Sequence, residues 1–358
     1  MSNAADGMNY APKGKPAPVC GPGEFRFAAV ALDHGHIYGM TNGLKEAGAE
    51  LVKVYDADPA KVAAFRKVHP EAEVASSEAE ILEDPTIQLV AAAAVPNLRA
   101  GLGMRVMAAG KDYFTDKAPF TTLEQLAEAR RLVAETGRKY MVYYSERLHT
   151  DSAMYAGELI AQGVIGKVVQ IICLAPHRLN APGRPDWFFR KEQYGGIICD
   201  IGSHQIEQIL HFSGATDAEI SSAAVANYNN PDYPELEDFG EASLVTNNGV
   251  SGYFRVDWFT PDGLAVWGDG RTFILGTDGY MELRKYIDVL QDPEGDQIYL
   301  VNQTGSQHLS VRGKVGFSFF GQLILDCLNR TENAMTQAHA FKAAELCLQA
   351  QAMARKIA

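Results

Sequence analysis

Cysteine is scarce in this sequence, and its few copies are not spaced for a structural role. The cysteines are Cys20, Cys173, Cys199, Cys327 and Cys347. No two of them lie at the close spacing of a zinc-binding pair, and an odd, scattered set does not suit a closed disulfide framework. We therefore predict no disulfide framework and no metal site, and we expect a reducing compartment, the cytoplasm.

Long apolar runs and an excess of positive charge are also missing. No apolar run approaches the roughly 20 residues that span a bilayer. Residues 1–24 are rich in glycine, proline and alanine and lack the apolar core of a signal peptide. The formal net charge of -12 opposes binding to the phosphates of nucleic acid and to anionic membrane surfaces. We therefore expect a small-molecule ligand, with neither nucleic acid nor a membrane as partner.

The composition that is present is that of a globular protein with two domains. Hydrophobic residues make up 47% and charged residues 21% of the 358 positions, and this length exceeds one ordinary core. We divide the chain into an arm at 1–24, a first domain at 25–147 and a second domain at 148–358. The arm is interpreted as a disordered tail or as a flexible segment that lies on a neighbouring subunit.

Short apolar runs alternate with helical patterns throughout the first domain, as they do in parallel βαβ units. We expect strands at 27–32, 51–55, 89–95, 112–115 and 139–144. We expect helices at 37–47, 59–68, 98–109 and 123–135, the last capped by Thr121 or Thr122. This order predicts a doubly wound parallel sheet of the nucleotide-binding kind, with its ligand crevice at the carboxyl ends of the strands.

Polar residues stand at several of these strand ends. Asp56 lies 23 residues after Asp33, where an acidic residue would bind the ribose hydroxyls of NAD and repel the extra phosphate of NADP. An ordinary turn residue is an equal alternative for Asp56. Pro96 and Asn97 follow a later strand, and Lys117 follows the one after it. We therefore place Asp56, Pro96, Asn97 and Lys117 in the cofactor crevice.

The turn after the first strand departs from the dinucleotide fingerprint, which requires glycines at set positions. Ala31 and Asp33 occupy the places expected for the first two glycines, and a carboxylate is awkward where the backbone meets a pyrophosphate. Two interpretations stay open. Asp33 caps the helix while the turn approaches the phosphates, or dinucleotide binding is weakened or lost. In the first case the contacting residues are Leu32, Asp33, His34, His36 and Ile37.

The second domain is dominated by strands. A helix at 152–162 and a strand at 167–175 precede an irregular loop at 176–187. The later strands are expected at 223–228, 239–246, 250–258, 272–276, 280–284 and 297–301, and the closing helices at 317–330 and 337–357. Consecutive strands joined by short turns predict a large, mostly antiparallel open sheet. The fold class is therefore α/β in both domains.

The stretch from Tyr194 to His204 carries the strongest chemical signal. The pair Gly195 and Gly196 allows a tight turn or close approach to a ligand, and an apolar helical run follows. Asp200 and His204 are four residues apart, so on a helix they share one face and form a plausible acid/base pair. The alternative, that Asp200 caps the helix and His204 is only packed, has about even weight on spacing alone.

The ordered set of motifs resembles the Gfo/Idh/MocA (glucose-fructose oxidoreductase / inositol dehydrogenase) family. The resemblance rests on Lys117-Ala118-Pro119 after a late strand, and on Gly195-Gly196, Asp200, Gly202 and His204 further on. It implies a Rossmann domain, a second domain whose open sheet often forms dimers or tetramers, and NAD or NADP as cofactor. It also implies Lys117, Asp200 and His204 as the active-site lysine and acid/base residues. Asp116-Lys117-Ala118-Pro119 replaces the family's Glu-Lys-Pro, and the lysine is retained.

We therefore predict an NAD(P)-dependent dehydrogenase acting at a CH–OH carbon of a sugar, inositol or related polyol. His204 would take the hydroxyl proton, Lys117 would stabilise the developing alkoxide, and Asp200 would orient the imidazole or bind a substrate hydroxyl. Two rival hypotheses are a ligand-binding sensor of the same fold and a lyase or hydrolase with tightly bound NAD. The candidate substrate contacts, with ordinary loop roles as the alternative, are Tyr144, Arg147, His177, Arg178, Asn180, Arg184, Trp187, Asp257 and Trp258.

Overall fold

The computed structural model describes residues 15–358, so most of the expected arm, residues 1–14, lies outside the described residues. The first sheet has six parallel strands in the order β3-β2-β1-β4-β5-β6. The strands are β1 (Arg26–Val30), β2 (Glu50–Tyr55), β3 (Glu73–Val74), β4 (Leu89–Ala92), β5 (Asp112–Asp116) and β6 (Tyr140–Tyr143). The chain order reverses between β1 and β4, which is where such sheets open a ligand crevice. The predicted doubly wound parallel sheet is confirmed.

Helices connect these strands, and their ends follow from local sequence. They are α1 (His36–Glu46), α2 (Pro59–Val68), α3 (Glu78–Glu83), α4 (Pro96–Ala108) and α5 (Leu123–Thr136). The Asp58 side chain caps α2 by accepting from the Ala60 N–H, and Thr122 caps α5 by accepting from the Gln125 N–H. Phe27, Ala28 and Ala29 of β1 are fully buried under the helices, as a central parallel strand requires.

The second sheet has nine strands in the order β14-β13-β12-β11-β7-β10-β9-β8-β15. Only the β7/β10 and β8/β15 pairs are parallel, so the prediction of a mostly antiparallel sheet is confirmed. The strands are β7 (Val168–Pro176), β8 (Ala218–Ala226), β9 (Phe239–Thr246), β10 (Ser251–Asp257), β11 (Arg271–Gly276), β12 (Gly279–Arg284), β13 (Gln297–Asn302), β14 (Gly305–Ser310) and β15 (Arg355–Lys356).

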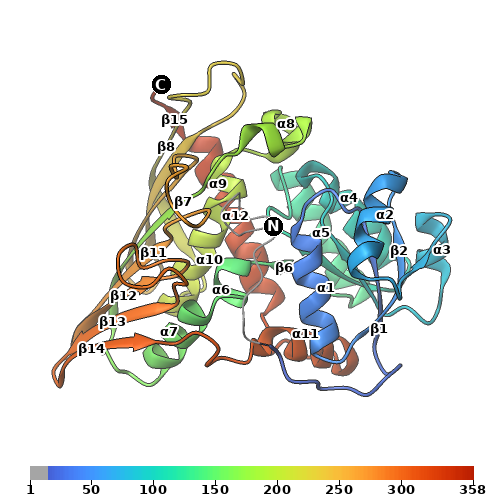
Figure 1. Cartoon of the computed structure of the whole chain (residues 1–358), viewed down its shortest axis with the longest axis horizontal. Coiled ribbons are helices and arrows are strands. Elements are labelled where there is room, and N and C mark those ends of the chain that lie inside the picture. Colours follow the sequence, from blue (N-terminus) through green and yellow to red (C-terminus); the bar gives the residue numbers. More distant parts are fainter. Residues whose placement is uncertain (1–14) are drawn as a thin grey trace.

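The remaining helices fill the space between the two sheets (Figure 1). They are α6 (Ser145–Leu148), α7 (Asp151–Ala161), α8 (Lys191–Tyr194), α9 (Ile197–Asp200), α10 (Gly202–Ser213), α11 (Ser318–Asn329) and α12 (Gln337–Met353), with two 3-10 turns at Ala181–Gly183 and Asp186–Phe189. Helices α7, α10 and α12 cover one face of the nine-stranded sheet. Within residues 15–358, no helix combines the length and apolar character needed to cross a bilayer.

The last two helices contact both halves of the molecule. Helix α11 packs against α1, and α12 contacts α5 and β6 of the first half as well as α10 and β8 of the second. Phe320 of α11 fits against Gly43 of α1, where a Cβ would come within 2.3 Å of the Phe320 ring. The domain limits at residues 147 and 148 therefore stay a prediction, because chain beyond residue 317 returns to the first sheet.

Candidate active site

Three side chains from two different domains meet in the crevice at the ends of the first sheet. Lys117 directly follows β5, Asp200 ends α9, and His204 lies in the first turn of α10. The Lys117 Nζ atom is 2.5 Å from the Asp200 Oδ1 atom. All three residues are buried and line the same cavity. The structure therefore brings together the three residues that the sequence nominated from positions more than 80 residues apart.

The local backbone differs from the single helix that spacing suggested. Asp200 ends one short helix, Ile201 links it to α10, and the Ser203 hydroxyl donates to the Asp200 carbonyl oxygen at 2.9 Å. Asp200 makes no side-chain cap. Gly196 has φ 95°, and a Cβ there would come within 2.3 Å of the Gln351 side chain. The glycine pair thus seats α9 against α12.

The cavity is small, with a volume of about 50 Å³, and is partly open to solvent. Of the expected site residues, it is lined by His34, His36, Lys117, His177, Arg184, Asp200, His204 and Trp258. Sequence reasoning missed the rest of the wall, which consists of Gly39, Tyr143, Ser145, Glu146, Thr150, Phe188, Trp267 and Tyr286. A space of this size holds a few water molecules.

Burial sets the charge states in this cavity. It lowers the pKa of His204 to about 3, although Glu146 opposes the shift, so the imidazole is neutral at physiological pH. Its Nδ1 atom has no hydrogen-bond partner among residues 15–358. Burial raises the pKa of Asp200, but the charge and hydrogen bond of Lys117 outweigh it and leave that pKa below its ordinary value. The site therefore holds a neutral base beside a charged lysine–aspartate pair.

Glu146 is the most informative residue that sequence reasoning missed. Its Oε2 atom accepts from Gln205 Nε2 at 3.0 Å and from Lys285 Nζ at 3.2 Å. Its Oε1 atom lies 3.7 Å from the His177 Nε2 atom and accepts no hydrogen bond from the described residues. Burial acts to raise the pKa of Glu146, but the positive charge of Lys285 opposes it, and the pKa is lowered to about 2. Glu146 comes just after β6, so the strand-end rule applied to that strand would have found it.

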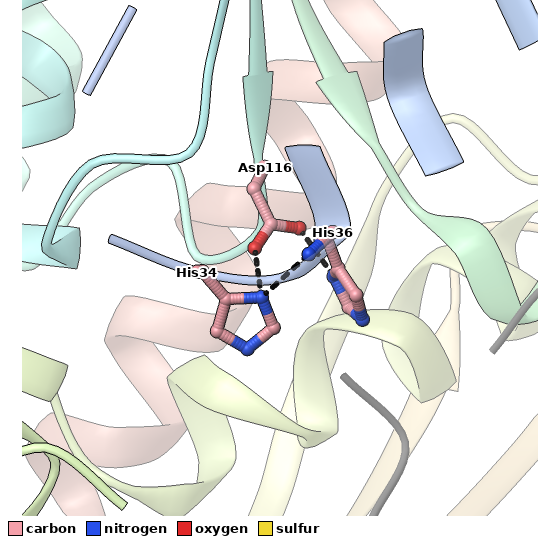
Figure 2. A group of neighbouring side chains, drawn as sticks. All are labelled: His34, His36 and Asp116. Carbon is pink, nitrogen blue, oxygen red and sulfur yellow. Dashed lines mark hydrogen bonds and ion pairs between the residues drawn. The ribbon is translucent and has the colours of Figure 1, made fainter. Parts of the chain in front are cut away.

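Figure 2 shows a second cluster, on the first-domain wall of the same cavity. The His36 Nδ1 atom is 2.8 Å from Asp116 Oδ1, and the His34 Nδ1 atom is 3.3 Å from Asp116 Oδ2. The Lys117 N–H and Arg99 Nη2 also donate to this carboxylate, at 2.8 and 3.2 Å. Burial would raise the pKa of Asp116, but His36 and Arg99 hold it well below its usual range.

The turn after β1 corrects one expectation. Asp33 does not cap α1: the helix begins at His36 with Gly35 at the cap position and no side-chain cap. The Asp33 Oδ1 atom instead pairs with Lys61 Nζ at 2.5 Å. Ala31 has φ 51°, in the left-handed region that glycine adopts most easily. At Ala31 the backbone therefore has the conformation expected of a glycine in the fingerprint, although the residue is alanine.

The residues present fit the nucleoside end of a dinucleotide better than its diphosphate. Asp56 stands at the end of β2, where its carboxylate accepts from the Leu32 N–H at 2.6 Å and the Asp58 N–H at 2.8 Å. Asp56 also lines a groove of about 840 Å³ beside α2 and the end of β3. At the diphosphate turn, the His36 and Ile37 N–H groups already donate within the turn. The negative charge of Asp33 is offset by Lys61.

Three of the expected substrate contacts have hydrogen-bond partners elsewhere in the structure. Tyr144 donates to the Ala340 carbonyl oxygen at 3.2 Å, and the Arg147 Nε atom donates to the Glu207 carboxylate at 2.8 Å. Arg178 donates to the carbonyl oxygens of Pro261 and Leu264, both at 2.7 Å. None of these three side chains lines the cavity. Their expected role as substrate contacts stays a prediction.

The other expected residues lie near the site without lining the cavity. The Trp187 ring is 6.5 Å from the His34 ring, and Asp257 pairs with Arg255 at 2.9 Å. Asn180 has φ 48° and precedes the first 3-10 turn. Pro96 and Asn97 form the first turn of α4, and the Asn97 carbonyl oxygen accepts from Gln125 Nε2 at 3.1 Å. Ile37 is fully buried in the core face of α1.

Together, the doubly wound sheet, the open second sheet and the lysine–aspartate–histidine cavity between them define a two-domain oxidoreductase with a nucleotide-binding domain. Residues 24–144 match the family described as "Oxidoreductase family, NAD-binding Rossmann fold". Residues 154–282 match the "GFO/IDH/MocA C-terminal domain". The chain belongs to the Gfo/Idh/MocA family, and its first domain is an NAD-binding Rossmann domain.

Similar proteins agree with this assignment. A crystal structure from Erwinia carotovora atroseptica SCRI1043, described in general terms as an oxidoreductase, is 52% identical, with a TM-score of 0.91 over 94% of this chain and 100% of that chain. D-xylose dehydrogenase of Paenarthrobacter nicotinovorans is 28% identical over 40% of this chain and 38% of its own length. The scyllo-inositol 2-dehydrogenase (NADP(+)) of Bacillus subtilis is 27% identical over 50% and 51%. The matches to these two curated relatives thus span about half of their length or less.

Proposed function

We propose that this protein is an NAD-dependent dehydrogenase that acts at a CH–OH carbon of a sugar, inositol or related polyol. The observation that carries the proposal is the 2.5 Å contact between Lys117 of one domain and Asp200 of the other, beside a neutral His204 in the same cavity. The curated relatives named above act on D-xylose and scyllo-inositol. A polyhydroxylated substrate is the class common to both.

The three residues have distinct roles in this proposal. Oxidation of an alcohol requires a base for the hydroxyl proton, and His204, neutral at physiological pH, has a ring nitrogen available to take it. Lys117 donates to the same oxygen and stabilises negative charge as it develops there. Asp200 positions Lys117 through their direct ion pair. NAD, when bound, supplies the hydride acceptor.

Cofactor choice follows from the end of β2. Asp56 is buried there with its carboxylate held by two backbone N–H groups, so its negative charge stays at the place expected for the adenosine ribose. A carboxylate in that place favours the free ribose hydroxyls of NAD and repels the 2′-phosphate of NADP. We therefore propose NAD as the preferred cofactor, with Asp56 holding its adenosine ribose beside the turn at residues 32–37.

The second sheet leaves one face for assembly. Val245 of β9, Leu275 of β11 and Tyr280 of β12 expose 49, 45 and 50% of their surface, and they lie opposite the helix-covered face. Apolar side chains exposed on one sheet are characteristic of contact surfaces. We propose that this face joins subunits into a homo-oligomer. Light scattering on the purified protein tests this: a monomer would contradict it.

The activity is tested by titration and turnover. NAD and NADP are titrated into the purified protein by calorimetry, and a panel of sugars and polyols is screened with NAD for the absorbance of reduced nicotinamide. We expect tighter binding of NAD than of NADP and turnover of at least one compound. Asp56→Ala should reduce this preference, because the repulsion of the 2′-phosphate is then removed. Absence of both binding and turnover across the panel would overturn the proposal.

A further inference from the structure

We propose that His34, His36 and Asp116 bind one divalent first-row transition-metal cation in the turn where dinucleotide-binding domains carry glycine. The inference does not depend on the proposed dehydrogenase activity. The sequence Asp33-His34-Gly35-His36 places two imidazoles, with one residue between them, in the turn where the dinucleotide fingerprint has glycines without side chains. Neither histidine belongs to the lysine–aspartate–histidine set.

The three side chains are arranged as a ligand set. Each offers one nitrogen or oxygen atom, and these atoms all lie within 4.8 Å of one another. The two rings approach edge to face, with centroids 4.3 Å apart. Asp116 is fully buried and His34 is 7% exposed. The set comes from two strand ends, β1 and β5, so the fold itself holds the ligands in position.

Two separations in the cluster fall in the range found between ligands of a single ion. Zinc bonds to imidazole nitrogen and carboxylate oxygen are about 2.0–2.2 Å long, so two ligands of one ion lie about 2.8–3.5 Å apart. The His36 and His34 nitrogens lie 2.8 and 3.3 Å from the Oδ1 and Oδ2 atoms of Asp116, respectively. Both imidazoles are therefore within ligand distance of the same carboxylate.

One contact in this cluster brings two acceptor atoms together. The His34 Nδ1 atom accepts from the backbone N–H of His36 at 3.2 Å, so it carries no hydrogen for the Asp116 Oδ2 atom, which lies 3.3 Å away. A cation bound between this nitrogen and the carboxylate would replace the acceptor–acceptor contact with two metal bonds. It would take the place of the hydrogen bond from the His36 N–H.

The neighbouring charges indicate which cations bind. Arg99 is 3.2 Å from Asp116 Oδ2, and Lys117 is the next residue in the chain, so positive charge already surrounds the carboxylate. Mg²⁺ and Ca²⁺, which need several oxygen ligands, are disfavoured here. Zn²⁺ and Co²⁺ gain from two imidazole nitrogens and suit the site. The Arg99 and Lys117 N–H donors would hold the carboxylate in place as outer hydrogen-bond partners.

The proposed ion would keep a coordination position facing the cavity. His34 and His36 both line its wall, together with Lys117 and His204. Three protein ligands with an open position are typical of zinc sites that bind a water or a substrate oxygen, whereas closed four-ligand sites are structural. A cavity of about 50 Å³ has room for an ion's water ligands.

The test is a metal titration on tag-free, chelator-treated protein. Zn²⁺, Co²⁺ and Mg²⁺ are titrated by calorimetry, and Co²⁺ binding is followed by its visible absorption. We expect one Zn²⁺ or Co²⁺ per chain and no comparable Mg²⁺ binding. His34→Gln and His36→Gln should each weaken binding at least about tenfold, whereas the exposed control His308→Gln should bind as the wild type does. Equal binding by all variants, or none by the wild type, would overturn the proposal.

A second measurement uses only the wild-type chain, in case a variant does not fold. Histidines are acylated with diethyl pyrocarbonate with and without Zn²⁺, and modified sites are read by mass spectrometry. We expect Zn²⁺ to protect His34 and His36 and to leave His308 unprotected. Protection that is uniform across the histidines, or absent at His34 and His36, would contradict the site.

Discussion

Lys117 and Asp200 form the only direct ion pair among the three catalytic candidates, and both are nearly buried, with side chains 8 and 12% exposed. A buried pair is costly to break, because removing one partner leaves the other as an unpaired charge in a low-dielectric environment. Asp200 therefore serves Lys117 directly, whereas the sequence had assigned it to orienting His204 or binding a substrate hydroxyl. Mutagenesis of the two residues can therefore measure the strength of this ion pair.

A double-mutant cycle measures this pair. Lys117→Met and Asp200→Asn should each lower the free energy of unfolding by about 3 kcal/mol. The double variant should lose at least about 1 kcal/mol less unfolding free energy than the sum of the losses in the two single variants, because neither charge is then left without its partner. Urea unfolding followed by circular dichroism gives the three values. Additive costs would show that the two side chains do not interact.

His204 gives a prediction for the pH profile of catalysis. Because burial lowers its pKa to about 3, the neutral base is present throughout the range from pH 5 to pH 8. We expect kcat/KM to show no fall near pH 6.5 on the acid side, where an unperturbed histidine would titrate. Steady-state rates in a series of buffers at constant ionic strength measure this. An acid-side break near pH 6.5 that disappears in His204→Asn would contradict it.

Which site residues the sequence could nominate depended on chain position more than on residue type. His34, His36 and Lys117 were found because they follow strands, and the strand-end rule fixes the edge at which they meet. Arg147 was expected to contact the substrate, because the sequence does not show with which residue a charged side chain pairs. Glu207, which pairs with it, lies 60 residues further along the chain. Glu146, its neighbour, was overlooked because the strand-end rule was not applied to β6.

At the scale of elements, long amphipathic segments were predictable and short polar ones were not. Helix α2 begins and ends at the predicted residues because Pro59 and the Asp58 cap mark its start. Strands β3 and β14 were missed: β3 has only two residues, both exposed, and β14 is polar and mostly exposed. Their pairing is set by neighbouring strands, so no apolar periodicity of their own marks them.

Two glycines in helices give opposite predictions. Gly43→Ala in α1 places a Cβ 2.3 Å from the Phe320 ring, so it should lower the free energy of unfolding by about 1–3 kcal/mol through overpacking. Gly101→Ala in α4 meets only a flexible arginine tip at 3.7 Å, so it should raise that free energy by up to about 1 kcal/mol through helix propensity. Thermal melts of both variants compare them. Equal shifts would refute the packing of α11 on α1.

At the scale of the whole molecule, buried histidines govern acid stability. Burial lowers the pKa of His149 and His204 to about 3, that of His177 to about 4, and that of His34 well below its usual value. In the unfolded chain they titrate near 6.5, so below that pH the unfolded state binds more protons and stability falls as pH falls. Asp296, whose pKa burial raises to about 7, offsets part of this between about pH 4 and 7.

We therefore expect the free energy of unfolding to decrease steadily from about pH 6.5 towards pH 4. The cause is proton uptake by the four histidines on unfolding, which exceeds the opposing contributions of Asp296, Asp151 and Asp257, whose pKa values are raised by burial. Urea midpoints at half-unit pH intervals measure the slope. His149→Gln, at a buried position that does not line the cavity, should reduce the slope by roughly the contribution of one proton. A midpoint independent of pH over this range would contradict the assignment of neutral buried imidazoles.

The proposed chemistry takes place between the two sheets, where His204 of α10 and Lys117, which directly follows β5, line one cavity. The most direct test is a single-turnover experiment, in which enzyme in excess over NAD is mixed with the best substrate from the polyol panel. We predict that wild-type protein forms reduced nicotinamide. His204→Asn should form it more than about 100-fold more slowly, with NAD affinity unchanged. Equal rates for the two proteins would contradict the account.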